Sequence, residues 1–172
     1  MNLTRVKVPL VVLLVLIVQT TMLSGLRNIG VRTDAMMLLP ITAGIVGGAE
    51  SGAVVGFLAG LVADLFLQTP LGLSALAYSL IGFGVGSVQG NIIRAAWWIA
   101  PLTSIAASAA GVVVYALVGA MVGQSGMVTG QLPLIAAWVA AVNGPLSIVL
   151  VRLMGWALKD PRPHSLRSVR AN

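Results

Sequence analysis

Residues 34–72 read DAMMLLPITAGIVGGAESGAVVGFLAGLVADLFLQTPLG, and a ladder of residues spaced four apart runs through them. The ladder consists of Pro40, Gly44, Gly48, Gly52, Gly56, Gly60 and Asp64. Residues four apart lie near one face of a helix, so these glycines would form a shallow groove in which a second helix backbone can approach closely. The pattern predicts tight helix packing around this stretch.

The ladder is too long to be one straight membrane-spanning helix. A straight helix from Asp34 to Leu67 would extend about 51 Å at 1.5 Å per residue, whereas the hydrocarbon core is about 30 Å thick. We expect a break at the sequence GGAESG, around Glu50, the only glutamate in the chain. This predicts two short helices, 35–48 and 52–68, that either cross the membrane or form a re-entrant hairpin, with Asp34 and Asp64 at the same end.

The composition predicts an integral membrane protein. Of the 172 residues, 58% are hydrophobic and only 8% are charged, whereas soluble domains carry about 25% charged residues. The chain has no cysteine, which excludes disulfides, thiolate catalysis and cysteine metal sites. The net charge of +6 does not indicate nucleic-acid binding, because the basic residues stand at the ends of apolar runs, as membrane orientation requires.

The remaining apolar runs complete a predicted all-α transmembrane bundle of six helices, or of four spans and one hairpin. The other four spans are residues 8–26, 71–90, 98–123 and 132–158. The fourth span has its own glycine ladder at Gly82, Gly86 and Gly90. We expect residues 1–158 to form a single bundle domain, and residues 159–172 to form a basic, disordered cytoplasmic tail without a core.

The distribution of basic residues predicts that both termini are cytoplasmic. This topology places eight basic residues inside or at the inner boundary, and only Arg27 and Arg32 outside, in agreement with the positive-inside rule. The eight are Arg5, Lys7, Arg94, Arg152, Lys159, Arg162, Arg167 and Arg170. The tail would also attract anionic lipid at the inner surface.

The same topology pairs each acid near the membrane with a basic residue at its own depth. Asp34 and Asp64 lie near the outer boundary beside Arg27 and Arg32, whereas Glu50 lies at the inner turn with Arg94. An intramembrane acid such as Asp64 often marks a transport pathway. Its other reading, a paired or hydrated boundary charge, is slightly favoured because no second acid lies at mid-depth on another span.

No constellation of residues predicts catalysis, a cofactor or a metal. The one histidine, His164, lies in the tail, so no nucleophile–base pair and no metal site can be assembled. Asn143-Gly144-Pro145 breaks the last span; such breaks line sites in transporters, but more often they kink a packed helix. The glycine ladder serves either packing within the chain or the docking of a partner's transmembrane helix.

The ladder region resembles the MreD family of rod shape-determining membrane proteins. The resemblance rests on Asp34 before an apolar helix, on GFLAGLVADL at residues 56–65, and on PLGL at residues 70–73. It is concentrated in residues 34–90, whereas the fifth and sixth spans match only in hydropathy. The longer basic tail departs from the family pattern.

The resemblance implies a non-enzymatic component of the cell-elongation machinery in the bacterial cytoplasmic membrane. The family works with the bitopic protein MreC, and through it with a penicillin-binding transpeptidase, the RodA glycosyltransferase and the MreB filament. The family fold is similar to the six-helix substrate-binding subunits of energy-coupling-factor vitamin transporters, which supplies the alternative function. Few aromatic residues and short outer loops favour the scaffold.

Overall fold

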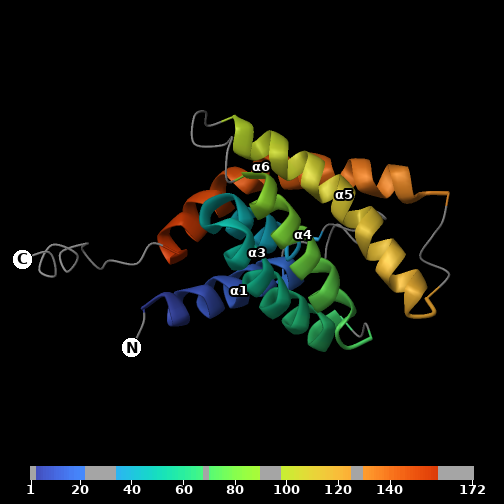
Figure 1. The fold of residues 1–172 in the computed structure, drawn as a ribbon, viewed down its shortest axis with the longest axis horizontal. Helices are drawn as coiled ribbons and strands as arrows, with labels where there is room; N and C mark the ends of the chain where they lie inside the picture. The colour runs from blue at the N-terminus through green and yellow to red at the C-terminus, as the bar shows by residue number, and fades with distance from the viewer. Residues whose placement is uncertain (1–2, 22–33, 68–69, 90–97, 125–129, 159–172) are drawn as a thin grey trace, which may run out of the picture.

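The computed structural model describes residues 3–21, 34–67, 70–89, 98–124 and 130–158, which form five α-helices (Figure 1). They are α1 (Leu3–Thr21), α3 (Leu38–Leu67), α4 (Leu73–Gln89), α5 (Ile99–Met121) and α6 (Leu132–Leu158). By length and composition α3, α5 and α6 can cross a membrane, and α1 and α4 contain the shorter apolar stretches Val6–Thr21 and Leu73–Val88. The protein is an all-helical, multi-pass membrane protein.

The prediction of six helices is wrong. The ranges 35–48 and 52–68 were expected as separate helices, but residues 38–67 form the single element α3, in which two helices are joined across a kink at Gly48. Inside α3 only Gly48 leaves the helical conformation, with φ 80° and ψ −173°. Glycine adopts such a positive φ without a steric penalty, so the chain changes direction at one residue and needs no connecting loop. With five helices in its described part, the chain also does not support the predicted similarity to six-helix vitamin-binding subunits.

The two halves of α3, on either side of Gly48, both lie against α4. A Cβ atom added to Gly44, in the first half, would lie 2.7 Å from the carbonyl oxygen of Gly82 in α4. Gly52, in the second half, approaches the same carbonyl, and its added Cβ would lie 2.9 Å from the Cα of Gly44. The kink therefore turns the second half of α3 back beside the first.

This arrangement gives the bundle two distinct ends. At the first, here called the aspartate end, Asp34 and Asp64 both bond to the N-terminal part of α4. At the second, here called the kink end, Gly48 lies beside Gly86 near the C-terminus of α4. The C-terminal part of α6 also lies at the kink end, because a Cβ atom added to Gly47 would lie 3.0 Å from Leu158 Cδ1. The N-terminal part of α1 meets it there through the contact of Lys7 with Trp156 (Figure 1).

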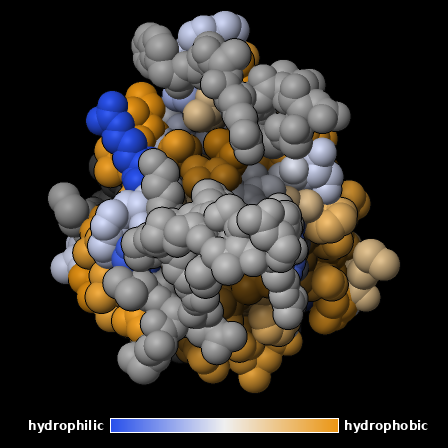
Figure 2. Space-filling view, turned by 60° about the vertical axis from the view of Figure 1, so that its left-hand side comes forward, coloured by the Kyte–Doolittle hydropathy of each residue, from blue (hydrophilic) through white to orange (hydrophobic). Residues whose placement is uncertain are grey.

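The core lies where the first half of α3 meets α1, α4 and α6. Its largest fully buried side chains include Met36, Leu39, Ile41, Tyr78 and Met154. The outward faces of the helices are also apolar, with many leucine, valine and phenylalanine side chains exposed. In Figure 2, hydrophobic side chains make up much of the coloured surface. Apolar residues on both the inside and the outside are expected of a protein whose solvent is lipid.

Candidate functional site

The tightest helix contact in the site region joins the glycines of α3 to α4. An added Cβ on Gly52 would overlap the backbone of Gly82, and an added Cβ on Gly56 would overlap the carbonyl group of Tyr78. The same holds for Gly60 against the backbone of Ala75. The obstructing atoms are backbone atoms, which cannot move aside as a flexible side chain can. These glycines therefore hold two helix backbones at a distance that no other residue permits.

Gly48 stands in the same ladder but has a different role. A Cβ atom at this position would meet nothing within 4 Å, so packing does not require a glycine there. Its φ of 80° does require one. Gly48 thus makes the kink, whereas its neighbours in the ladder make the contact with α4.

Asp64 supplies hydrogen-bond acceptors to the N-terminus of α4. Its Oδ2 atom accepts from the backbone N–H of Gly72 at 2.8 Å and of Ala75 at 3.4 Å, and its Oδ1 atom accepts from the N–H of Ser74 at 3.1 Å. The first N–H groups of a helix have no partner inside the helix, and they attract negative charge. The side chain is only 2% exposed, so this carboxylate acts as a buried cap from a neighbouring helix.

Asp34 links the start of α3 to α4. The hydroxyl of Tyr78 donates to its Oδ2 atom, and the N–H of Met37 donates to its Oδ1 atom at 3.3 Å. Beside it, the side-chain oxygen of Gln19 in α1 accepts from the N–H of Met36 at 2.9 Å. Asp34 and Gln19 thus satisfy N–H groups that precede α3, and they fix α1, α3 and α4 to one another at the aspartate end.

A second tyrosine extends this cluster to α5. The ring centroids of Tyr78 and Tyr115 lie 6.4 Å apart, and Ser74 donates to the Tyr115 hydroxyl at 3.5 Å. The cluster of Asp34, Asp64, Ser74, Tyr78 and Tyr115 joins three helices through hydroxyl and carboxylate groups. Among the described residues no three His, Cys, Asp or Glu side chains gather as a metal site would require. The geometry of the cluster fits a structural role, in which it holds α3, α4 and α5 together.

A polar seam joins α5 to α6 and consists of Ser104, Ser108, Asn143 and Ser147, all fully buried. The side-chain amide of Asn143 donates to the Ser108 hydroxyl at 2.9 Å. Ser147 donates to the carbonyl oxygen of Gly144 at 2.6 Å. The Ser147 bond lies within α6, whereas the Asn143–Ser108 bond is interhelical, and such bonds hold helices together where no hydrophobic effect operates between them. The helix α6 runs through this seam and through Pro145 as one element.

Replacing Asn143 by leucine should weaken the α5–α6 contact modestly. Double-mutant cycles on interhelical hydrogen bonds in membranes average about 0.6 kcal/mol, with about 1.7 kcal/mol as the largest value. We therefore expect a coupling of this size between Asn143→Leu and Ser108→Ala, measured by unfolding in mixed micelles. Ser87→Ala is the matched control, because the Ser87 hydroxyl donates to the Phe83 carbonyl oxygen within its own helix and bonds to no other helix in the described part of the chain. A coupling of zero would show that the seam hydrogen bond contributes nothing.

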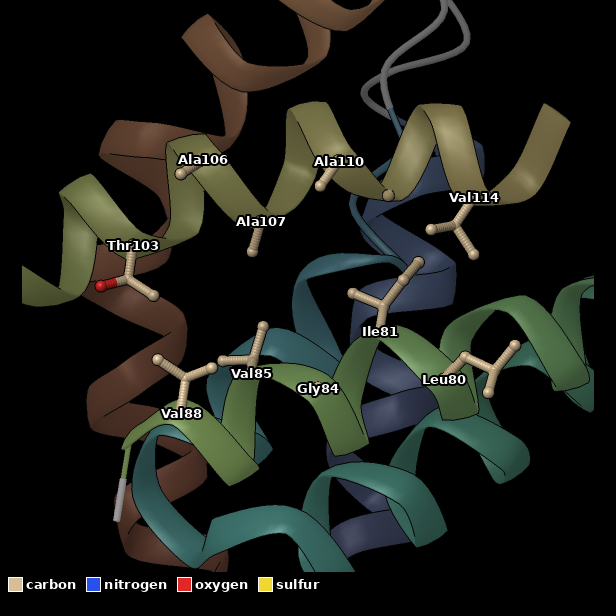
Figure 3. A pocket seen from close by; sticks show the side chains of 11 residues that line it. Leu80, Ile81, Gly84, Val85, Val88, Thr103, Ala106, Ala107, Ala110 and Val114 are labelled. Atoms are coloured by element: carbon tan, nitrogen blue, oxygen red, sulfur yellow. The ribbon is translucent and has the colours of Figure 1, made fainter. Parts of the chain in front are cut away.

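An apolar groove lies between α4 and α5 (Figure 3). It has a volume of about 490 Å³ and is lined by Leu80, Ile81, Gly84, Val85, Val88, Thr103, Ala106, Ala107, Ala110, Gly111 and Val114. Thr103 is the only polar side chain among them, and its hydroxyl already bonds to the Ile99 carbonyl at 2.9 Å. A vitamin-binding pocket needs convergent polar groups, which this groove does not offer.

The structure separates the residues singled out in the sequence into groups. Gly44, Gly52, Gly56, Gly60, Gly82 and Gly86 meet at the α3–α4 contact. Asp34 and Asp64 lie at the aspartate end, whereas Glu50 is exposed near the kink. Arg27, Arg32, Arg94 and the tail 159–172 lie outside the described residues.

Sequence reasoning missed the partners of the aspartates and the groove. Tyr78 is one of only two tyrosines, and it follows Ser74 by one helical turn. The hydroxyl of a buried tyrosine usually has a hydrogen-bond partner. The sequence therefore indicated that Tyr78 needs an acceptor, and an aspartate near the same depth could have been predicted as that acceptor. The groove gave no comparable signal, because its alanines and glycines resemble those of any packed membrane helix.

Comparison with known proteins identifies the family. A family model described as rod shape-determining protein MreD matches residues 2–157, nearly the whole chain. Comparisons with curated proteins and with solved structures give no match. The match covers every helix of the bundle, including α5 and α6, where the sequence resemblance was weakest. The chain belongs to the MreD family of rod shape-determining proteins.

Proposed function

We propose that this protein is a non-enzymatic membrane scaffold of the bacterial cell-elongation complex. It binds MreC in the cytoplasmic membrane, with both of its own termini in the cytoplasm. Through MreC it supports peptidoglycan synthesis by the penicillin-binding transpeptidase and RodA, and it connects them with MreB. Family membership supports the role in rod shape determination. The observation that supports a docking role is the open α4–α5 groove.

The groove, and not the glycine ladder, is the surface proposed for docking. The ladder glycines face α4 within the same chain, so a partner helix has no access to them. In contrast, a Cβ atom added to Gly84 would meet nothing within 4 Å. On α5, Ala106 and Ala110 line the groove one helical turn apart, and Ala107 points toward α4 (Figure 3). The α4 wall otherwise carries larger side chains, so the point where a third helix backbone can approach closely is at Gly84 and the alanines of α5.

The transmembrane helix of MreC suits this groove on chemical grounds. MreC is bitopic, so it offers one apolar helix whose backbone hydrogen bonds are satisfied within itself. The groove likewise offers apolar walls, and it demands no polar partner because Thr103 is already bonded. Within lipid such a contact gains from close van der Waals packing, which large side chains in place of Gly84 and the α5 alanines would prevent.

Filling the groove should abolish MreC binding and leave the fold intact. In the variant Gly84→Leu/Ala110→Leu, two isobutyl groups occupy the space of the partner helix. A loss of about 1.4 kcal/mol or more in binding free energy would lower the affinity for MreC at least tenfold. The measurement is co-purification of MreC from bacterial membranes, together with thermal unfolding of the variant. Ala137→Leu is the control, because Ala137 is exposed on α6 outside the groove. Normal co-purification with the filled groove at wild-type protein levels would overturn this docking site.

A further inference from the structure

A cationic contact lies at the kink end, where α1 meets α6. Lys7 Nζ lies 4.6 Å from the centroid of the Trp156 ring and donates to the Trp156 carbonyl oxygen at 3.4 Å. Trp156 belongs to the last turn of α6, whose carbonyl groups have no N–H partner within the helix. Lys7 thus caps this helix end. An ammonium group has three donors, so the cap leaves donors available to a ligand.

Arg152 adds a second cation to this face. It stands four residues before Trp156 on α6, and side chains at this spacing are neighbours on a helix surface. Arg152 is exposed and forms no ion pair with another described residue. Glu50, at the same end of the bundle, is also exposed and forms no ion pair within the described part of the chain. The two cations therefore present their charge to an outside partner.

The surface that continues from these cations along the helices is apolar. On α1, Leu10 and Leu14 follow Lys7 by three and seven residues and are 56% and 45% exposed. On α6, Val149 precedes Arg152 by three residues and is 62% exposed. Residues at these spacings share a helix face. Figure 2 shows a face of the molecule on which hydrophilic side chains lie beside hydrophobic ones.

We propose that Lys7, Arg152 and Trp156 bind the phosphate headgroup of an anionic phospholipid, whose acyl chains lie along α1 and α6. An arginine fork and an ammonium group both form charge-assisted hydrogen bonds with phosphate oxygens. A tryptophan ring is suited to the boundary between headgroups and hydrocarbon. Basic pockets between transmembrane helices are a known mode of headgroup binding. The inference does not depend on the binding of MreC.

The test measures the retention of phosphatidylglycerol and of phosphatidylcholine by the full-length protein in neutral detergent, using native mass spectrometry. For Lys7→Gln/Arg152→Gln we expect the preference for phosphatidylglycerol to fall about 25-fold, or about fivefold for each charge removed. Arg27→Gln/Arg32→Gln is the matched control, because it removes the same net charge from a segment beyond the opposite end of α1. Lys7→Arg/Arg152→Lys keeps both charges and should keep the preference.

Three results would overturn the site. An unchanged preference in Lys7→Gln/Arg152→Gln would show that these residues do not hold the headgroup. An equal fall in the matched control would show a response to net charge alone. Displacement of the lipid by millimolar inorganic phosphate would show a site for free anions. Since Arg152 is exposed, the single variant Arg152→Gln should fold normally and show its fivefold effect even where the double variant unfolds.

Discussion

Replacing Gly52 by leucine should prevent the protein from folding, and even alanine there should be strongly destabilising. The first added carbon already overlaps the backbone of Gly82, and it lies 2.9 Å from the Cα of Gly44. Since backbone atoms block the space on both sides, the halves of α3 and the helix α4 would have to separate. Overpacking of a well-packed core costs about 1–3 kcal/mol; a clash with two backbones should place Gly52→Ala at the upper limit of this range or above it.

The control for this prediction lies on the partner helix. Gly84→Ala adds the same methyl group where nothing lies within 4 Å, and alanine is the better helix former by about 1 kcal/mol. We expect Gly84→Ala to be neutral or stabilising in mixed-micelle unfolding, and Gly52→Ala to lower both the unfolding midpoint and the protein level in membranes. Equal stability of the two alanine variants would show that α3 and α4 do not pack through Gly52.

The two glycine results also separate packing from docking. Gly52 variants should lose MreC binding only because folded protein is lost. Filling the groove with Gly84→Leu/Ala110→Leu should lose binding at normal protein levels. A Gly52 variant that folds but fails to bind MreC would instead indicate that MreC docks on the glycine ladder.

The membrane class and the kinked stretch could be predicted from sequence, because each depends on local properties. Composition and apolar runs indicated a helical membrane protein. The length of the ladder showed that it had to break, and the glycines around Glu50 indicated where. The helix count could not be obtained in this way. Whether GGAESG forms a loop or a one-residue kink depends on how both halves pack on α4, and this is a tertiary effect that overrides local preference.

The candidate site was less predictable, because it depends on pairs of residues far apart in the chain. Tyr78 and Asp34 are 44 residues apart, and Asn143 and Ser108 are 35 apart. Spacing within one helix cannot reveal such pairs. The charge pattern suggested arginine partners for the aspartates, whereas the described contacts of Asp64 with α4 are to backbone N–H groups. Helix termini compete for carboxylates as cations do, and a sequence pattern alone does not decide between them.

Asp64→Leu should produce the largest loss of stability of any single polar substitution in the described residues. It removes the acceptor for the N–H groups of Gly72, Ser74 and Ala75 in an almost fully buried place. Each buried donor left without a partner costs about 1–3 kcal/mol, so we expect a total loss of at least about 3 kcal/mol. Asp64→Asn keeps one oxygen acceptor and should retain part of the stability.

Hydrogen exchange then distinguishes a cap from a transport or proton-relay residue. If Asp64 is a helix cap, Asp64→Leu should speed amide hydrogen exchange at Gly72, Ser74 and Ala75. Loss of function should then follow the loss of folded protein. Glu50→Gln is the control: Glu50 is exposed and has no ion pair within the described part, so its stability should change by less than about 0.5 kcal/mol. In a relay, Asp64→Asn would fold normally, keep slow exchange at these amides and still fail to support rod shape. That result would contradict the capping role, because the charge itself would then be the required feature.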